Sequence, residues 1–395
     1  MTRVLELSAQ AAGGVRAHIR QVSQLLAKDG HQVLLAGPSN VISPADDAVG
    51  GACLRTYQIN IGARPSGADL KALRQLKQLA ATAQVIHAHG LRAGALAVLA
   101  VKRLPAAKRP RVVVTLHNLP VGSAPTRLVG QVLQLVVVKG ADYVLTVSPD
   151  LLEKAKQLGL KAGEIAVVPA PARGCADCGC MDRAAQSEIS QASAQSSHAG
   201  SGVGAGSGVG AGSSYGASSA AGCGATPCVL TIARLAPQKG LDLLLEAAAL
   251  IKQRGIDFTW LVAGDGPLKA QLNQQIAAAA LPVKLLGRRE DIGALLSQAD
   301  VVVQTSYWEG QPLTLREAMQ AGRAIVATDV GGSAYTLAGC GQLVEPQAGP
   351  LADAVVAVIS DPKRRETLEA ASRAAVAKIP GETQLREQLD RVLKL

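Results

Sequence analysis

The sequence predicts an α/β protein with two domains, each built on a parallel sheet covered by helices. Short apolar segments rich in β-branched residues recur along the chain, and most are followed by segments whose apolar residues have helical spacing. A tract of Gly, Ser and Ala separates two such runs, and nothing in it can form a core. We therefore expect a domain at 1–172, a long disordered linker at 173–226, a second domain at 227–380 and a last helix at 381–395.

The N-terminal part alternates strand-like and helix-like segments. Residues 40–83 are the least regular, with one or two strands expected around 54–61 and a polar helix at 70–80. The other expected strands are 3–7, 32–36, 85–88, 112–116, 143–148 and 165–169, and the other expected helices are 15–28, 91–102, 127–139 and one that starts at Ser148 and Pro149.

The C-terminal part is organised around a strand at 300–305, a loop, a helix and a strand at 324–328. Pro312 suits the first position of that helix and Gly322 its end. Further strands are expected at 229–233, within 258–263 and at 341–345, a loop at 286–288, and three helices within 349–395.

Composition limits the class of protein. The chain has 395 residues, of which 48% are hydrophobic, which is enough for two cores. No apolar run of about 18 residues occurs, so no membrane-spanning helix is expected. A strand-like segment follows Met1 directly, without a signal peptide, and we expect a cytoplasmic protein.

The net charge of +10 is uneven: residues 1–173 hold 21 Lys or Arg against 9 Asp or Glu, whereas the remainder holds 19 against 21. No recognition motif accompanies the basic residues, so nucleic acid is not an expected partner. A solvated basic surface with phosphate contacts, or peripheral contact with an anionic inner membrane face, remains open. The apolar helix at 127–139 likewise has two readings, a core helix, which we favour, or one resting on a membrane.

Two carboxylates mark the loop after the strand at 300–305: Glu309 precedes the helix and Glu317 lies inside it. Carboxylates accept paired hydrogen bonds from vicinal hydroxyls, as on a sugar or a ribose. Between them, the backbone N–H groups of Leu313 and Thr314 open the helix and can face an anion. A nucleotide-sugar, with phosphates between two hydroxyl-bearing ends, fits this layout, although this spacing of two Glu residues is common by chance.

Other segments carry groups suited to phosphate. Arg234 follows the strand at 229–233, and Lys239 stands where the next helix begins. The pair combines the planar guanidinium group of Arg with the compact ammonium group of Lys, and both groups bind phosphate. Gly13 and Gly14 lie between a strand and a helix, where missing side chains permit a close approach to a phosphate or to a packed neighbour. Each pattern is weak by itself.

The block WEGQPLTLREAMQAGRAIVATDVGG, residues 308–332, resembles the Glu-x7-Glu donor loop of retaining glycosyltransferases of family 4, which have the GT-B fold. The resemblance covers both domains without the linker and is strongest over 229–332. It implies two facing Rossmann-like domains, with the acceptor bound by 1–172 and the donor by 227–380, and with 381–395 crossing back to the first domain.

The resemblance also implies roles for single residues. His117, in the segment Thr-x-His, faces the donor sugar; without the resemblance, a lone His at a strand end is more often structural. Glu309 holds the hexose, Glu317 the ribose, and the loop at Gly287 and Arg288 the base. The expected catalytic residues are His117, Arg234, Lys239 and Glu309. The expected donor-binding residues are Gly13, Gly14, Arg234, Lys239, Gly287, Arg288, Glu309, Gly310, Leu313, Thr314 and Glu317.

The expected chemistry needs no cofactor and no metal. Many metal-dependent transferases use an Asp-x-Asp triplet, and none occurs in this sequence. Arg234, Lys239 and the amides of Gly14 and Thr314 would stabilise the leaving phosphate instead. The resemblance implies retention of the anomeric configuration, for which we expect a same-face displacement assisted by a phosphate oxygen.

The expected partners are a UDP- or GDP-linked sugar and a glycan or lipid-linked acceptor of the cell envelope. Two departures from the family pattern keep other functions open: the usual Asn-Gly pair is missing before the linker, and Gln238 replaces a common Glu. The alternatives are a non-catalytic nucleotide-sugar-binding protein, an epimerase of the same fold, or a scaffold that binds membranes or polyanions. His87 and His89 are further candidates for lining the acceptor cleft.

All seven cysteines are expected to be reduced thiols. A zinc site is a less favoured alternative for those in the linker region, because their spacing is not that of a standard finger. They are Cys175, Cys178, Cys180, Cys223 and Cys228.

Overall fold

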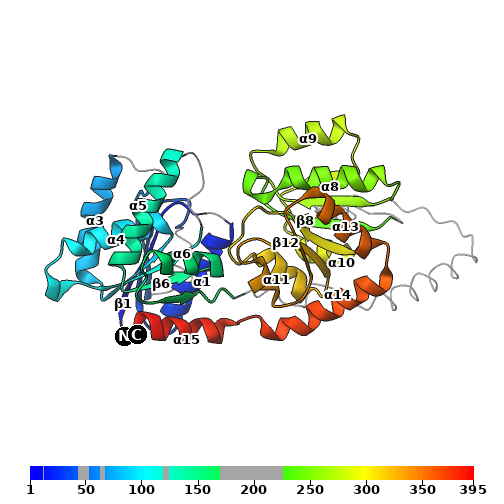
Figure 1. Cartoon of the computed structure of the whole chain (residues 1–395). Coiled ribbons are helices and arrows are strands. Elements are labelled where there is room, and N and C mark those ends of the chain that lie inside the picture. The colour runs from blue at the N-terminus through cyan, green and yellow to red at the C-terminus, as the bar shows by residue number, and fades with distance from the viewer. Residues whose placement is uncertain (12, 43–52, 63–66, 119–123, 170–225) are drawn as a thin grey trace, which may run out of the picture.

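The structure is a computed structural model, and it describes all residues except 12, 43–52, 63–66, 119–123 and 170–225. The described residues form two α/β halves that lie side by side (Figure 1). The predicted linker falls outside them, apart from its last residue, Thr226.

The N-terminal half contains a sheet of seven parallel strands in the order β3-β2-β1-β4-β5-β6-β7. The strands are β1 (Arg3–Ser8), β2 (Gln32–Gly37), β3 (Leu54–Gln58), β4 (Val85–His89), β5 (Arg111–Leu116), β6 (Tyr143–Thr146) and β7 (Gly163–Ile165). The helices are α1 (Gly13–Lys28), α3 (Ala68–Thr82), α4 (Leu91–Lys102), α5 (Ala124–Gly140) and α6 (Pro149–Gln157), with the 3-10 turn η2 (Ala106–Lys108).

The C-terminal half contains a sheet of six parallel strands in the order β10-β9-β8-β11-β12-β13. The strands are β8 (Cys228–Ile232), β9 (Thr259–Ala263), β10 (Val283–Gly287), β11 (Val301–Gln304), β12 (Ala324–Thr328) and β13 (Gln342–Val344). The helices are α8 (Leu241–Gln253), α9 (Lys269–Ala278), α10 (Ile292–Gln298), α11 (Leu313–Gln320), α12 (Ser333–Leu337), α13 (Ala348–Ile359), α14 (Pro362–Ala375) and α15 (Glu382–Leu393), with the 3-10 turns η3 (Pro237–Lys239) and η4 (Val376–Lys378).

Each sheet is covered on both faces because strand side chains alternate between the faces. In β1, Leu5 and Leu7 pack with α3, α4 and α5, whereas Val4 packs with α1 and α15 on the opposite face. In β11, Val303 packs with α8 and α13, whereas Val302 packs with α10 and α11. The two parallel sheets covered by helices, predicted from the sequence, are confirmed.

The last helix, α15, packs on the N-terminal sheet (Figure 1). Leu389 is 2% exposed in a core that includes Val113 of β5. The side chain of Gln388 donates to the carbonyl of Ile165 at 2.9 Å and accepts from the amide of Val167 at 2.7 Å. These bonds attach α15, at the end of the chain, to the end of β7 and the residues after it in the N-terminal half.

Some element boundaries differ from the predicted ones. α1 begins at Gly13, so the glycine pair forms its first turn and not the loop before it. β7 shares only Ile165 with the strand predicted at 165–169. Beyond it, the carbonyl of Ala166 accepts from Gln311 and the amide of Val167 donates to Gln388. Pro312 is the residue before α11 and adopts extended backbone.

The cysteines differ in part from the prediction. Cys53 and Cys340 are free thiols, whereas Cys228 is disulfide-bonded, so the expectation of seven reduced thiols is wrong at that position.

Helix α5 fits neither of its two readings alone. Val137 and Val138 are buried, but Leu128, Val132 and Leu135 are 62%, 56% and 46% exposed. The end of α5 is therefore buried in the core at Val137 and Val138, whereas Leu128, Val132 and Leu135 form an exposed apolar stripe along the helix. Within the described ranges, no helix is both long enough and apolar enough to cross a membrane.

The packing of α15 predicts the effect of shortening its buried leucine. Leu389→Ala should lower the free energy of unfolding by about 2–5 kcal/mol, through lost burial and a residual cavity. Glu387→Ala, a substitution at an exposed position of the same helix, is the control and should change it by less than about 0.5 kcal/mol. Urea unfolding followed by circular dichroism measures both, and equal shifts of the two variants would contradict the packing.

Candidate active site

The predicted residues Lys239 and Glu309 meet at the carboxyl edge of the second sheet. Lys239 ends the turn η3 after β8, and Glu309 lies in the loop after β11, the neighbouring strand. The Lys239 ammonium forms an ion pair with the Glu309 carboxylate, which also accepts a hydrogen bond from Ser306 Oγ at 2.6 Å. The sequence assigns these two residues to different parts of a ligand, whereas here each is the partner of the other.

The backbone holds the two segments together. Gly240 adopts a positive φ of 58°, and a Cβ there would collide with the carbonyl oxygen of Thr305, so only glycine fits. Thr305 Oγ1 in turn donates to the carbonyl of Lys239 at 2.8 Å. The position of Lys239 relative to the loop after β11 is therefore determined by close backbone packing.

A narrow cavity opens beside this ion pair. Its walls come from the ends of β8 and β11, the loop after β11 and the first turn of α11. The lining residues are Thr231, Ile232, Ala233, Lys239, Gln304, Thr305, Ser306, Glu309 and Thr314. Thr314 therefore brings the start of α11 to the cavity, as the predicted anion-facing helix end requires.

The other predicted donor residues of the C-terminal half, apart from Lys239, Glu309 and Thr314, do not line this cavity. Glu317 lies one turn after Thr314 on α11 and is half-buried. Arg234 is exposed just beyond β8, and Arg288 is exposed after Gly287, whose φ is 70°. The structure thus brings Lys239, Glu309 and Thr314 together and leaves both arginines at the surface.

The loop after β11 also contacts the N-terminal half. Trp308 Nε1 donates to Asp150 Oδ2 at 3.0 Å, and Gln311 Nε2 donates to the carbonyl of Ala166 at 2.7 Å. Both acceptors belong to the N-terminal half, so the loop that contributes Glu309 to the cavity also joins the two halves.

Two predicted glycines permit this close approach. A Cβ on Gly310 would press into the side chain of Val147, and one on Gly14 would lie 3.2 Å from Leu313 Cδ1. Gly14 therefore faces the start of α11 across the interface, beside the predicted phosphate position.

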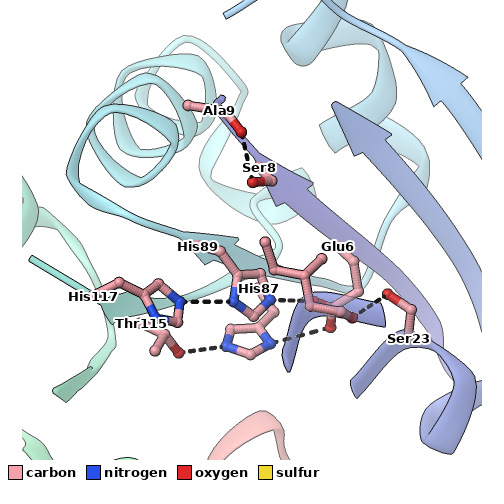
Figure 2. A network of polar contacts seen from close by, with 9 residues as sticks. Glu6, Ser8, Ala9, Ser23, His87, His89, Thr115 and His117 are labelled. Carbon is pink, nitrogen blue, oxygen red and sulfur yellow. Dashed lines mark hydrogen bonds and ion pairs between the residues drawn. The ribbon is translucent and has the colours of Figure 1, made fainter. Parts of the chain in front are cut away.

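A polar network lies on the N-terminal side of the interface. Glu6 in β1, His87 and His89 in β4, and Thr115 in β5 all point to the sheet face covered by α1, because they occupy alternate strand positions in register. His117 follows β5 directly. Figure 2 shows these five side chains joined in one network.

The Glu6 carboxylate is the centre of the network. Its oxygens lie 3.1 Å from His87 Nδ1 and 2.7 Å from His89 Nε2. Beyond them, His87 Nε2 lies 2.8 Å from Thr115 Oγ1, and His89 Nδ1 lies 3.3 Å from His117 Nε2. Glu6, His87, His89 and Thr115 are at most 2% exposed, whereas His117 is 6% exposed.

This burial corrects one prediction. His87 and His89 do not line a cleft, because their side chains are covered and bonded to Glu6. They form the layer behind His117.

Burial also sets the protonation of the network. It lowers the pKa of His89, and it lowers that of His117 further, with the neighbouring histidines acting in the same direction. His18 of α1, whose ring lies 5.9 Å from that of His117, has its pKa lowered to about 3 for the same reasons. Burial acts to raise the pKa of Glu6, but the two histidines it contacts lower it to about 2. The network therefore combines one negative charge with neutral rings at His18, His89 and His117.

The sequence prediction missed Glu6, His18 and Thr115. The available signal was an acidic residue in the middle of the apolar strand VLEL, since a buried carboxylate needs hydrogen-bond partners. The partners come from β4, which is distant in sequence.

Among the described residues, Glu6, His87 and His89 form the one group whose ligand atoms are close enough to hold a metal ion, all within 4.8 Å of one another. Each of these atoms already has a hydrogen-bond partner within the network. The cavity next to Lys239 has no such group in the described part of the chain.

Comparison with known protein families gives matches for both halves. Residues 226–361 match the family described as glycosyl transferases group 1, and residues 13–171 match the glycosyl transferase 4-like domain. The two matches adjoin the tract that the structure leaves undescribed.

Curated relatives match a smaller part. The chain is 35% identical over 149 residues to alpha-D-kanosaminyltransferase of Streptomyces kanamyceticus, which covers 36% of this chain and 39% of the relative. It is 37% identical over 114 residues to the amylovoran biosynthesis glycosyltransferase AmsK of Erwinia amylovora, which covers 26% and 28%. The chain thus matches well under half the length of these relatives.

Among solved structures, the whole chain resembles Anabaena Alr3699/HepE in complex with UDP-glucose. The TM-score is 0.72 at 20% sequence identity, and the match covers 100% of both chains. This likeness shows a common fold over both halves. Together with the two family matches, it places the chain among the glycosyltransferases that have the GT-B fold.

Proposed function

We propose that the chain is a retaining, metal-independent glycosyltransferase of family 4 that transfers a hexose from a nucleotide diphosphate sugar to a polysaccharide or glycolipid acceptor of the cell envelope. The observation that carries the proposal is the cavity at the carboxyl edge of the second sheet, where Lys239, Glu309 and the start of α11 meet. The family matches favour a glycosyltransferase over the epimerase and the binding protein.

The Lys239–Glu309 ion pair suits exchange for a ligand. Their side chains are 20% and 10% exposed, so the pair is accessible from the cavity. A bound donor replaces it with two stronger sets of bonds, phosphate oxygens on the ammonium and sugar hydroxyls on the carboxylate. Before binding, the ion pair holds both side chains in place.

The proposed reaction breaks the bond between the anomeric carbon and the phosphate oxygen, whose electron pair goes to the phosphate. Lys239, Arg234 and the amides of Gly14 and Thr314 stabilise that growing negative charge. The acceptor oxygen bonds to the same face of the anomeric carbon, and its proton passes to a phosphate oxygen. Glu309 and His117 hold the sugar.

Donor binding is tested first by thermal unfolding. A UDP-, GDP- or ADP-sugar at about 100 times its dissociation constant should stabilise the protein by about 2.7 kcal/mol. UDP-glucose is the first choice because the Anabaena protein of the same fold was crystallised with it. In Lys239→Ala the ligand-induced shift of the melting temperature should disappear, since the diphosphate loses its cation.

The control is Lys77→Ala, at an exposed position of α3. It should keep the full ligand-induced shift. No shift of the unmodified protein with any of the three donor classes would count against the transferase.

The stereochemistry and the metal independence are tested together. With a donor identified above and a candidate acceptor, the product in the presence of EDTA should form at an unchanged rate and keep the anomeric configuration of the donor, as seen by proton NMR. An inverted product would rule out the same-face displacement, and loss of the reaction on chelation would rule out metal independence.

We also propose that the apolar stripe of α5 rests on an anionic membrane, where a lipid-linked acceptor would lie. Leu128, Val132 and Leu135 line a groove of about 400 Å³ together with Lys154 of α6. Exposed apolar side chains beside basic ones are typical of helices that bind the membrane interface. The excess of basic residues in the N-terminal half supports an anionic partner.

Sedimentation with liposomes tests this surface. The double variant Leu128→Ser, Val132→Ser should bind vesicles of anionic lipid roughly tenfold more weakly, since about 1.4 kcal/mol of apolar burial is lost. Leu70→Ser, which removes a leucine that is 67% exposed on α3, is the matched control and should bind normally. Equal binding by the double variant and the unmodified protein would refute the surface.

A further inference from the structure

We propose that Glu6 and His89 are positioning residues that hold His117 in one tautomer, with hydrogen on Nε2 and with Nδ1 as a hydrogen-bond acceptor for a hydroxyl of the donor sugar. The inference deepens the proposed function, because it rests on the role of His117 at the sugar. It assigns a purpose to buried polar groups that the reaction itself does not touch.

The argument starts at the carboxylate. An ionised carboxylate only accepts hydrogen bonds, and the low pKa of Glu6 keeps it ionised at neutral pH. The nitrogens that face it, His87 Nδ1 at 3.1 Å and His89 Nε2 at 2.7 Å, must therefore both carry hydrogen.

The next step follows from the imidazole ring. A neutral ring has one donor and one acceptor nitrogen. Because His89 donates from Nε2, its Nδ1 is an acceptor, and the atom facing it at 3.3 Å, His117 Nε2, carries the hydrogen. The remaining nitrogen of His117, Nδ1, is then an acceptor.

The surroundings of His117 agree with this assignment. Within the described part of the chain, His117 Nδ1 has no hydrogen-bond partner, whereas Nε2 is occupied by His89. Burial and the rings of His18 and His89 oppose a second proton on His117. A sugar hydroxyl can therefore only donate to this nitrogen, which selects the orientation of the hydroxyl.

His87 and Thr115 form a side branch of the same network. Thr115 Oγ1 lies 2.8 Å from His87 Nε2, and among the described residues the hydrogen bond of the His117 ring is to His89 and not to either of these two. This branch supplies a matched control, because a substitution there disturbs a buried hydrogen bond of the same network without interrupting the series Glu6–His89–His117.

The direct test is NMR of the full chain labelled with ¹⁵N-histidine, in the absence of donor and acceptor. Two-bond and three-bond proton–nitrogen correlations distinguish the two tautomers and the imidazolium. At pH 7, His117 should have hydrogen on Nε2 only, and Thr115→Val should leave the His117 signals unchanged while shifting those of His87. Hydrogen on Nδ1 of His117, or an imidazolium, would overturn the proposal.

Metal ligation is the alternative for Glu6, His87 and His89. Zinc added to the labelled protein should leave the His87 and His89 nitrogens protonated as described. Loss of the hydrogen on those nitrogens with zinc, reversed by EDTA, would overturn the proposal and identify a metal site instead.

The kinetic test uses Glu6→Gln. A carboxamide offers one acceptor oxygen where the carboxylate offers two, so His87 and His89 can no longer both donate to residue 6, and the tautomer of His117 becomes mixed. The kcat should fall about tenfold or more with little change in KM for the donor, as expected when a ring nitrogen is presented in the wrong state. Thr115→Val should keep kcat, and equal losses in the two variants would indicate a merely structural role.

The outcomes separate this inference from the proposed function. The tautomer is measured without any reaction, so the spectrum can be correct in a protein that transfers no sugar. Conversely, a protein that binds and transfers the donor with the wrong His117 tautomer would overturn the positioning role alone. If Glu6→Gln fails to fold, the spectrum of the unmodified chain still decides.

Discussion

The common direction of the strands is the constraint on which the rest of this structure depends. In a parallel sheet every strand ends at the same edge, so groups at the carboxyl ends of neighbouring strands are brought together. This explains how Lys239, after β8, meets Glu309, after β11. It equally explains the meeting of Glu6 in β1 with the histidines of β4 and with His117 after β5. Both sets then lie near the interface of the halves.

The two halves each bury a carboxylate near that interface, and they stabilise it differently. Glu6 is bonded to rigid rings and is fully covered, so its partners are permanent. Glu309 is bonded to the flexible side chain of Lys239, which is 20% exposed. A ligand can displace such a cation, whereas it cannot reach the rings around Glu6. The first carboxylate suits positioning and the second suits binding.

Local patterns predicted much of the fold and the donor loop. The helix at 91–102 and the strand at 324–328 have the predicted bounds, because their apolar periods and the residues that end them lie within a few positions. The Glu6–His89 contact was not predictable in this way: it joins residues 83 apart and depends on β4 lying beside β1. The ion pair of Lys239 with Glu309 was missed for the same reason, although both residues were singled out.

Consecutive residues of the loop after β11 are attached to opposite halves. Trp308 is bonded to Asp150 in one half, the next residue, Glu309, to the other, and Gly310 again packs on the first. The backbone of this loop therefore connects the ion pair of Glu309 directly to the contacts between the halves. A displacement of the backbone at Glu309 would reach the contacts that join the halves within one peptide unit on either side.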